Sequence, residues 1–339
     1  MASIEPAARG GGPGRLVLRR RRRGIGATLQ PGLVALGLLL TLVGLFGAYR
    51  YVWTFWLYRG FPPPPVPVAR IDGHSKPVLP GTLRTIEVAS PAVGATLPAI
   101  VYLPPGYDTH PRRRYPTIYL LHGVPGSPQQ FVDVGDVQVV EALLVARHQM
   151  PPAIIVMPEG SPSLVDDTEW VNGQGRDQAW MSYVASDVVK AVEHSYRTID
   201  RGADRAIAGL SEGGYGALNI ALHHPGEFGL VESWSGYTEP SAARRYFGGS
   251  SILEAANDPA VEARRERSAL RADHTYIWFY VGNKDNDLGQ NVRLDRELTA
   301  LGLPHHFFVR AGSHNWKLWR SLMSKSLIEA GKYFTRARR

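Results

Sequence analysis

The chain has 339 residues, of which 44% are hydrophobic and none is cysteine, so it can bury a sizeable core but cannot form disulfides, thiolate metal sites or a cysteine nucleophile. Its formal net charge is +8, but residues 1–60, with nine arginines and one glutamate, account for all of that excess. The remaining residues carry 29 basic and 29 acidic side chains, and a domain without a cationic surplus is not expected to bind nucleic acid.

The first predicted element is a membrane-spanning helix. Residues 24–49 are 26 consecutive positions without a charge, and roughly 20 apolar residues suffice to cross a hydrocarbon core. Because the basic run Arg19–Arg23 precedes them, we expect residues 1–23 to be cytoplasmic and the C-terminal domain to be extracytoplasmic, with the protein at the cell membrane as a single-pass chain. The transmembrane helix with its aromatic interface belt is assigned to residues 24–58. A cleaved signal peptide is the alternative, although no small-residue cleavage site follows the apolar run.

A proline-rich linker is predicted next, over residues 59–81. The stretch FPPPPVPVARIDGHSKPVLPG at 61–81 has too many prolines for a helix or a central strand and favours an extended spacer. The alternative is an arm that packs on the domain that follows.

Residues 82–339 are predicted to form one α/β domain. Short β-branched runs alternate with amphipathic stretches, which indicates a mostly parallel sheet flanked by helices, and the first two strands are expected to pair as an antiparallel hairpin. The expected strands are Thr82–Ala89, Leu97–Tyr102, Thr117–His122, Ala153–Met157, Arg205–Leu210, Gly229–Ser235, Tyr276–Val281 and His306–Val309. The expected helices are Val137–Arg147, Ala179–Tyr196, Glu212–His223, Asn291–Leu301 and Lys317–Phe334.

A serine lies at the end of one of these strands. Gly209-Leu210-Ser211-Glu212-Gly213 matches the G-x-S-x-G motif, with an apolar strand before it and a helix after it. In such an elbow the serine takes a strained backbone conformation, and the flanking glycines avoid collisions within the turn. An ordinary glycine-rich turn is the alternative interpretation of the motif alone.

A serine nucleophile needs a base, and the base needs an orienting acid. Asp285 and Asp287 follow the strand Tyr276–Val281, and His314 follows the last strand. The order serine, aspartate, histidine is that of α/β-hydrolases. Either aspartate can be the acid, and Asp285 is preferred because it leaves the strand first.

Two backbone N–H groups complete the predicted site as an oxyanion hole. They belong to Val124, just after the strand that ends at His122-Gly123, and to Glu212, beside the serine. His122 itself is expected to brace this loop. The side chain of Glu212 lies next to the nucleophile and is a candidate for selecting cationic or hydroxyl-rich substrates.

At these residues the chain resembles the α/β-hydrolase esterase family that includes feruloyl esterase domains, S-formylglutathione hydrolases and the antigen 85 mycolyltransferases. The resemblance rests on YPTIYLLHGVPGS, AIAGLSEGGYGALNIALHHPGEFG, ESWSG, YVGNKDNDLG and AGSHNWKLW. It implies Ser211 as nucleophile and His314 as base. For the acid, the feruloyl-esterase-like pattern implies Asp285, and the mycolyltransferase pattern a position near Asp287.

The sequence therefore predicts a membrane-anchored serine esterase that forms an acyl-serine intermediate on a small-molecule, lipid or glycan ester. An acyltransferase of the mycolyltransferase type and a catalytically inactive scaffold of the same fold are the alternatives. No cofactor is expected, and no metal, because His223-His224 lacks partner ligands and DNDLG at 285–289 lacks the last acid of a calcium loop. The oligomeric state is not determined by these patterns.

Overall fold

The computed structural model describes residues 31–59, 80–161, 167–175 and 178–337. The chain divides into two compact units, residues 1–50 and 51–339. The predicted basic segment 1–23 and residues 60–79 of the predicted linker lie outside the described residues.

The N-terminal helix α1 (Pro31–Arg59) overlaps the predicted transmembrane helix. The side chains of its aromatic C-terminal part lie outside the described set. Among the described helices, none has the combined length and hydropathy needed to cross a membrane, so the structure does not support the prediction of a transmembrane helix.

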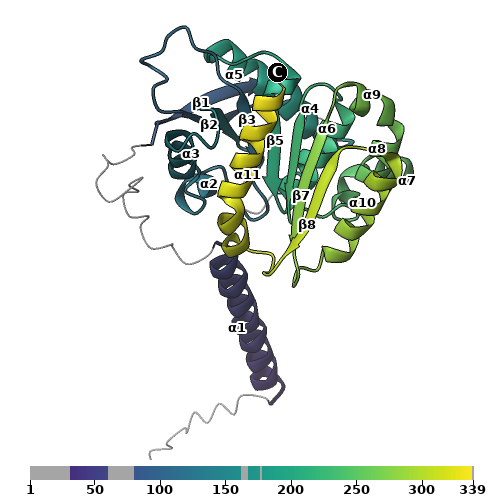
Figure 1. Ribbon diagram of the computed structural model, residues 1–339. Coiled ribbons are helices and arrows are strands. Elements are labelled where there is room, and N and C mark those ends of the chain that lie inside the picture. Colours follow the sequence, from purple (N-terminus) through teal and green to yellow (C-terminus); the bar gives the residue numbers. More distant parts are fainter. Residues whose placement is uncertain (1–30, 60–79, 162–166, 176–177, 338–339) are drawn as a thin grey trace, which may run out of the picture. The chain divides into compact units, whose positions relative to one another are not determined.

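An eight-stranded sheet with the order β1-β2-β4-β3-β5-β6-β7-β8 organises the second unit (Figure 1). β1 pairs with β2 as the predicted antiparallel hairpin, β2 is also antiparallel to β4, and the other pairs are parallel. The carboxyl ends of the parallel strands therefore share one edge of the sheet. The strands are β1 (Thr82–Ser90), β2 (Ala95–Leu103), β3 (Thr117–Leu121), β4 (Ile154–Pro158), β5 (Arg205–Leu210), β6 (Leu230–Trp234), β7 (Tyr276–Gly282) and β8 (His305–Arg310).

Helices cover both faces of this sheet, as expected when parallel strands are joined by crossover connections. They are α2 (Gln129–Asp133), α3 (Val137–Ala146), α4 (Trp180–Ser182), the π-helical turn η1 (Tyr183–Val188), α5 (Val189–Ser195), the 3₁₀ turn η2 (Gly202–Asp204), α6 (Glu212–His223), the 3₁₀ turn η3 (Ala242–Phe247), α7 (Ser251–Ala256), α8 (Pro259–Arg265), α9 (Arg267–Ala272), α10 (Leu288–Leu301) and α11 (Trp316–Arg336).

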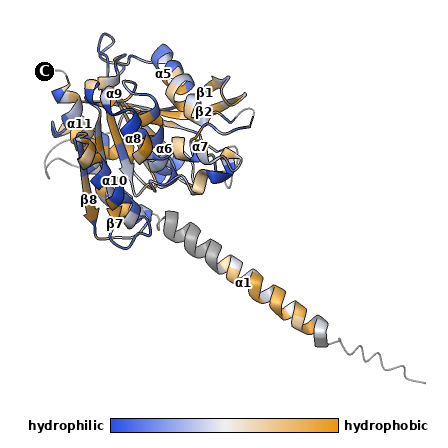
Figure 2. Ribbon diagram, turned by 90° about the vertical axis from the view of Figure 1, so that its right-hand side faces the viewer, coloured by the Kyte–Doolittle hydropathy of each residue, from blue (hydrophilic) through white to orange (hydrophobic). Residues whose placement is uncertain are grey.

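Two hydrophobic clusters lie on opposite faces of the sheet because side chains alternate along each strand. On β3, Tyr119 and Leu121 face the cluster that includes α5, α6 and α10, whereas Ile118 and Leu120 face α2, α3 and α11. Figure 2 shows largely hydrophobic strands, with hydrophilic residues on the helices around them. The central strands β3, β4, β5 and β6 are thus buried on both faces, in an α/β-hydrolase-like fold.

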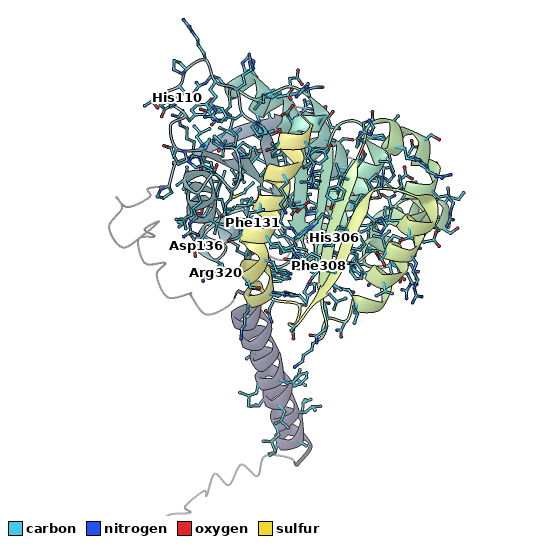
Figure 3. All side chains as sticks on the ribbon, viewed as in Figure 1. His110, Phe131, Asp136, His306, Phe308 and Arg320 are labelled. Atoms are coloured by element: carbon cyan, nitrogen blue, oxygen red, sulfur yellow. The ribbon has the colours of Figure 1, made fainter. Side chains whose placement is uncertain are left out.

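Helix α11 is tied to the start of α3 by an ion pair. Arg320 of α11 donates to the carboxylate of Asp136, and Phe131 of α2 packs edge-on against Trp316 of α11. Figure 3 shows Phe131, Asp136 and Arg320 gathered on this side of the sheet. The contact matters for the site because α11 begins two residues after His314.

Candidate active site

Ser211 occupies the turn between β5 and α6 in a strained backbone conformation. Its φ of 56° and ψ of −123° lie outside the regions that side-chain-bearing residues prefer, and such a conformation costs on the order of 1–3 kcal/mol. A Cβ at Gly209 would lie 2.1 Å from the carbonyl oxygen of Gly213, and a Cβ at Gly213 would lie 2.0 Å from that of Leu121. Only glycines fit at both positions, so this turn has the geometry of a nucleophile elbow.

Three predicted residues meet at this edge of the sheet. The Oγ of Ser211 lies 2.8 Å from Nε2 of His314, and Nδ1 of His314 lies 2.9 Å from Oδ2 of Asp285. They follow the ends of β5, β8 and β7; His314 is 103 residues from Ser211 and 29 residues from Asp285 in the chain. Both imidazole nitrogens thus have partners, and in the tautomer that suits them Nδ1–H donates to the carboxylate while Nε2 accepts from the serine hydroxyl.

Asp285 lies closer to the histidine than Asp287 does. The nearest oxygen of Asp287 is 4.0 Å from Nδ1 of His314, and its other oxygen accepts a 2.6 Å hydrogen bond from Gln290. Burial by itself would raise the pKa of the Asp285 carboxyl, but hydrogen bonding and charge interaction with His314 hold that pKa below its ordinary value. Burial and then the charge of Asp285 raise the pKa of Asp287. Asp285 is therefore the carboxylate that is both near and ionised.

The loops that carry the acid and the base are tied to each other. Asn283 accepts a 3.0 Å hydrogen bond from the backbone N–H of Gly312, and the N–H of Lys284 donates to the carbonyl of Gly312 at 3.0 Å. The ring of Trp319 packs edge-on against His314 with centroids 5.1 Å apart. These contacts fix the imidazole before any substrate arrives.

The backbone of α6 begins against the exit of β3. Glu212 is the first residue of α6, so its N–H has no partner within the helix, and the helix dipole favours negative charge there. The close approach of Gly213 to the carbonyl of Leu121 brings this N–H near the loop that contains Val124. The two predicted oxyanion donors therefore lie on segments in contact.

His122 braces this loop, as expected. Its Nδ1 lies 3.1 Å from the carbonyl oxygen of Gly123, its Nε2 accepts from the N–H of Gly160 at 3.1 Å, and its ring is 1% exposed. Both ring nitrogens are thus occupied away from Ser211, and His122 is not placed to act as the base.

Glu212 and the tryptophans near the site are buried. Glu212 is 4% exposed and bonds to the backbone of a neighbouring segment, so its carboxyl does not face a substrate. The expected role of Glu212 in selecting substrates is wrong for that reason. The tryptophans near the site are packing residues: Trp170, Trp180, Trp316 and Trp319 are all at most 7% exposed. Sequence reasoning missed the contacts of the Glu212 side chain and the hydrogen bond from Gln290 to Asp287; the spacing of three residues was the only signal for the latter.

Among the described residues, one group has the side chains to hold a metal ion: Asp285, Asp287 and His314, whose ligand atoms lie within 4.8 Å of one another. Both ring nitrogens of His314 already take part in hydrogen bonds, one with Asp285 and one with Ser211.

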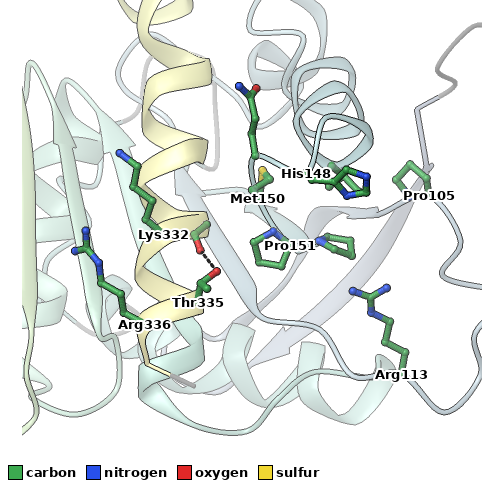
Figure 4. Close-up of a pocket in the computed structure, with 12 residues that line it drawn as sticks. Pro105, Arg113, His148, Met150, Pro151, Lys332, Thr335 and Arg336 are labelled. Carbon is green, nitrogen blue, oxygen red and sulfur yellow. Dashed lines mark hydrogen bonds between the residues drawn. The ribbon is translucent and has the colours of Figure 1, made fainter. Parts of the chain in front are cut away.

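A cavity of about 670 Å³ lies elsewhere, at the opposite edge of the sheet (Figure 4). Its lining includes Arg113, which precedes β3, Met150 and Pro151, which precede β4, and Lys332 of α11. The serine and its partners follow the carboxyl ends of the strands, so this cavity is not part of the site.

A strained serine lies at a strand-to-helix turn of a mostly parallel sheet and is joined through histidine to a buried aspartate. This arrangement defines the protein as an α/β serine hydrolase. Comparison with known proteins specifies the family. A family model described as "Putative esterase" matches residues 90–330, so the chain belongs to this Esterase family of hydrolases and acyltransferases.

Three curated relatives illustrate the range of the family. The chain is 27% identical to an uncharacterized protein of Corynebacterium glutamicum (67% of this chain, 55% of the relative) and 26% identical to an endo-1,4-beta-xylanase/feruloyl esterase of Xylanibacter ruminicola (74% and 32%). It is 25% identical to the diacylglycerol acyltransferase/mycolyltransferase Ag85A of Mycobacterium leprae (74% and 82%). The chain thus spans about half and about a third of the first two relatives.

Solved structures share the fold. A ferulic acid esterase superposes with a TM-score of 0.66 at 23% identity, covering 74% of this chain and 98% of that one. An S-formylglutathione hydrolase from Agrobacterium tumefaciens gives 0.64 at 16% identity, covering 75% and 96%.

Proposed function

We propose that this protein is a carboxylic ester hydrolase that works through an acyl-serine intermediate. The observation that carries the proposal is the hydrogen-bonded series from Ser211 through His314 to Asp285, with distances of 2.8 and 2.9 Å. Membership of the Esterase family supports it.

In the proposed reaction, Ser211 Oγ attacks the ester carbonyl carbon while Nε2 of His314 takes the hydroxyl proton. The carbonyl oxygen becomes an oxyanion that accepts hydrogen bonds from the N–H groups of Val124 and Glu212. The imidazolium then gives its proton to the departing alkoxide oxygen, and the C–O bond of the ester breaks. Asp285 stays ionised throughout and stabilises the imidazolium.

Water completes the cycle in an esterase. His314 takes a proton from water as its oxygen attacks the acyl carbon, and then returns that proton to Ser211 Oγ as the carboxylic acid leaves. The relationship to a mycolyltransferase favours a second candidate, in which a sugar or lipid hydroxyl replaces water. The same residues serve both outcomes.

A fluorophosphonate probe tests the proposal, because it phosphonylates only a serine activated by its base. We expect the full chain to be labelled and Ser211→Ala to remain unlabelled. Absence of labelling in the folded wild-type protein would refute the proposed function. Incubation with a 4-nitrophenyl ester in the presence and absence of a sugar acceptor then separates hydrolysis from transfer by the product formed.

We also propose that the chain is anchored in the cell membrane by its N-terminal segment, with the hydrolase domain on the extracytoplasmic side. The support is the run of 26 uncharged residues at 24–49 and the arginines before it. Fractionation of cells expressing the full chain tests this: the protein should stay in membranes washed with carbonate, and recovery in the wash would refute anchoring.

A further inference from the structure

Glu212 follows the nucleophile in the chain, but its carboxyl group has no part in the proposed reaction. Its Oε1 accepts hydrogen bonds from the backbone N–H groups of Glu169 at 2.8 Å and Thr168 at 3.3 Å. These residues are more than 40 positions away in sequence. Among the described side chains, Glu212 is the acceptor for the N–H groups of both Glu169 and Thr168. Glu212 therefore attaches the segment Asp167–Trp170 to the start of α6.

This segment needs such an attachment because its backbone is strained. Glu169 and Trp170 have φ values of 54° and 53°, the left-handed region that residues with a Cβ avoid. Two such residues in succession persist only where the surroundings hold them.

Trp170 links the segment Asp167–Trp170 to the loop that contains Val124, called the oxyanion loop below. Its indole N–H donates to the carbonyl of His122 at 3.1 Å, two residues before Val124. The ring is fully buried, and a Cβ at Gly160 or Gly216 would lie 2.1 Å or 2.6 Å from Trp170 atoms. Because the indole is locked between these two glycines, movement of Trp170 has to move the backbone at His122.

We propose that Glu212 is a positioning residue, whose side chain holds the oxyanion loop in place through the segment Asp167–Trp170, and that it does so as an uncharged carboxylic acid. The inference rests on the proposed acyl-serine reaction, in which the N–H of Val124 binds the oxyanion.

The surroundings of the carboxyl favour its uncharged form. Asp167 and Glu169 face it from the attached segment, and Arg245 of η3 pairs with Asp167 at 2.6 Å. Burial and then the charge of Asp167 raise the pKa of Glu212 to about 8, and burial and then the charge of Glu212 raise the pKa of Glu169. Within the described residues, Oε2 of Glu212 and Oε2 of Glu169 have no hydrogen-bond partner, which is a costly state for an ionised oxygen. A charge on Glu212 would also add a negative charge to the residue whose N–H is proposed to bind the developing oxyanion, and would oppose its formation.

Two substitutions separate the hydrogen bonds of Glu212 from its charge. Glu212→Gln keeps an acceptor for the two N–H groups and cannot ionise, whereas Glu212→Leu removes the acceptor. Glu232→Leu is the matched control, since Glu232 is also buried, at 1% exposure, with a pKa raised to about 8 by burial, but binds Trp234 and Ser326.

The measurement is the second-order rate of fluorophosphonate labelling from pH 6 to 10, together with kcat and KM for 4-nitrophenyl acetate and the melting temperature. At pH 7 we expect Glu212→Gln to stay within about threefold of the wild type in kcat. Glu212→Leu should lose about 30-fold or more in kcat with KM little changed, since complete loss of one oxyanion donor costs about 100- to 1000-fold. The wild-type rate should decline above about pH 8 and the Gln variant should not. The control should match the wild type in kcat.

Each other outcome overturns a specific part. Equal labelling rates for the wild type and Glu212→Leu would refute the positioning role, and a Gln variant as slow as the Leu variant would refute the uncharged form. If Glu232→Leu loses as much kcat as Glu212→Leu, the effect is general destabilisation and the inference fails. A wild type that is not labelled at all would instead refute the proposed function, and the inference with it.

Discussion

Replacement of Asp285 by asparagine is the most direct test of how the site is assembled. The amide keeps the shape of the side chain but removes the negative charge 2.9 Å from Nδ1 of His314. With an effective dielectric constant of about 20, the lost attraction to an imidazolium at that distance is about 6 kcal/mol. At 1.36 kcal/mol per factor of ten, this corresponds to roughly a 10⁴-fold lower kcat, and orienting aspartates in other serine hydrolases show losses of that order when changed to asparagine.

Asp287→Asn provides the matched comparison. At 4.0 Å from Nδ1 of His314, its attraction would be about 4 kcal/mol with the same dielectric constant. Solvent reduces that value because the Asp287 side chain is 23% exposed, against 1% for Asp285. We expect Asp287→Asn to lose less than about tenfold in kcat.

The assay is the rate of fluorophosphonate labelling and of 4-nitrophenyl acetate hydrolysis at pH 7, with circular dichroism to confirm that both variants fold. A larger loss for Asp287→Asn than for Asp285→Asn would mean that the geometry described here is not that of the reacting enzyme. Equal and small losses would mean that neither carboxylate orients the histidine.

Three further predictions concern stability. Gly213→Ala places a Cβ 2.0 Å from the carbonyl of Leu121 and should lower the free energy of unfolding by roughly 3 kcal/mol or more; Gly289→Ala, whose Cβ would meet nothing closer than 3.7 Å, is the control, and equal urea midpoints would contradict the steric argument. Burial raises the pKa of Glu232 from 4.5 to about 8, so its neutral form stabilises the fold fully below pH 4.5 and this contribution is lost as the pH rises through about 8. Glu232→Gln should therefore remove up to about 5 kcal/mol of the fall in stability between pH 5 and 8, and a wild-type-like pH profile would refute this. Arg205→Met leaves three partly exposed carboxylates without their shared partner and should cost about 1–3 kcal/mol by urea denaturation, whereas an unchanged midpoint would show that the ion-pair network contributes nothing.

Most of the sheet could be predicted from the sequence because its strands are short apolar runs bounded by turn residues. β5 and α6 have the predicted bounds, and the other strands differ by one or two residues at their ends. Fully buried strands leave a strong local signal, and the G-x-S-x-G motif fixes the element on each side of it.

The short helices after β6 were not predicted. α7, α8 and α9 have six or seven residues each, too few for a clear helical period. One signal was present: Asp258 caps α8 by accepting from Ala260 and Val261, and Pro259 occupies the first turn. The region Ala179–Tyr196 was predicted as one helix, but it contains a π-helical turn at Tyr183–Val188, which side-chain periodicity does not reveal.

The residues of the site were likewise predictable only in part. Ser211, His314 and Asp285 were predictable because each follows the carboxyl end of a parallel strand, and those ends must meet at one edge. The contacts of the Glu212 side chain were not, because the segment Asp167–Trp170 has no pattern that points to α6. Its position depends on two hydrogen bonds to Glu212 and on the space beside Gly160 and Gly216.

Because the reacting groups follow three different strands, the reactivity of Ser211 depends on whether all three strands are paired in the sheet. β8, which precedes His314, is one of the two edge strands and, among the strands that the structure describes, pairs with β7 alone. If β8 detached from β7, the imidazole of His314 would move away from the hydroxyl of Ser211 while the central strands stayed paired. The reactivity of Ser211 with a fluorophosphonate should therefore disappear at a lower temperature or urea concentration than the burial of the core tryptophans. Labelling of the serine would thus detect detachment of the edge strand that tryptophan fluorescence of the core does not detect.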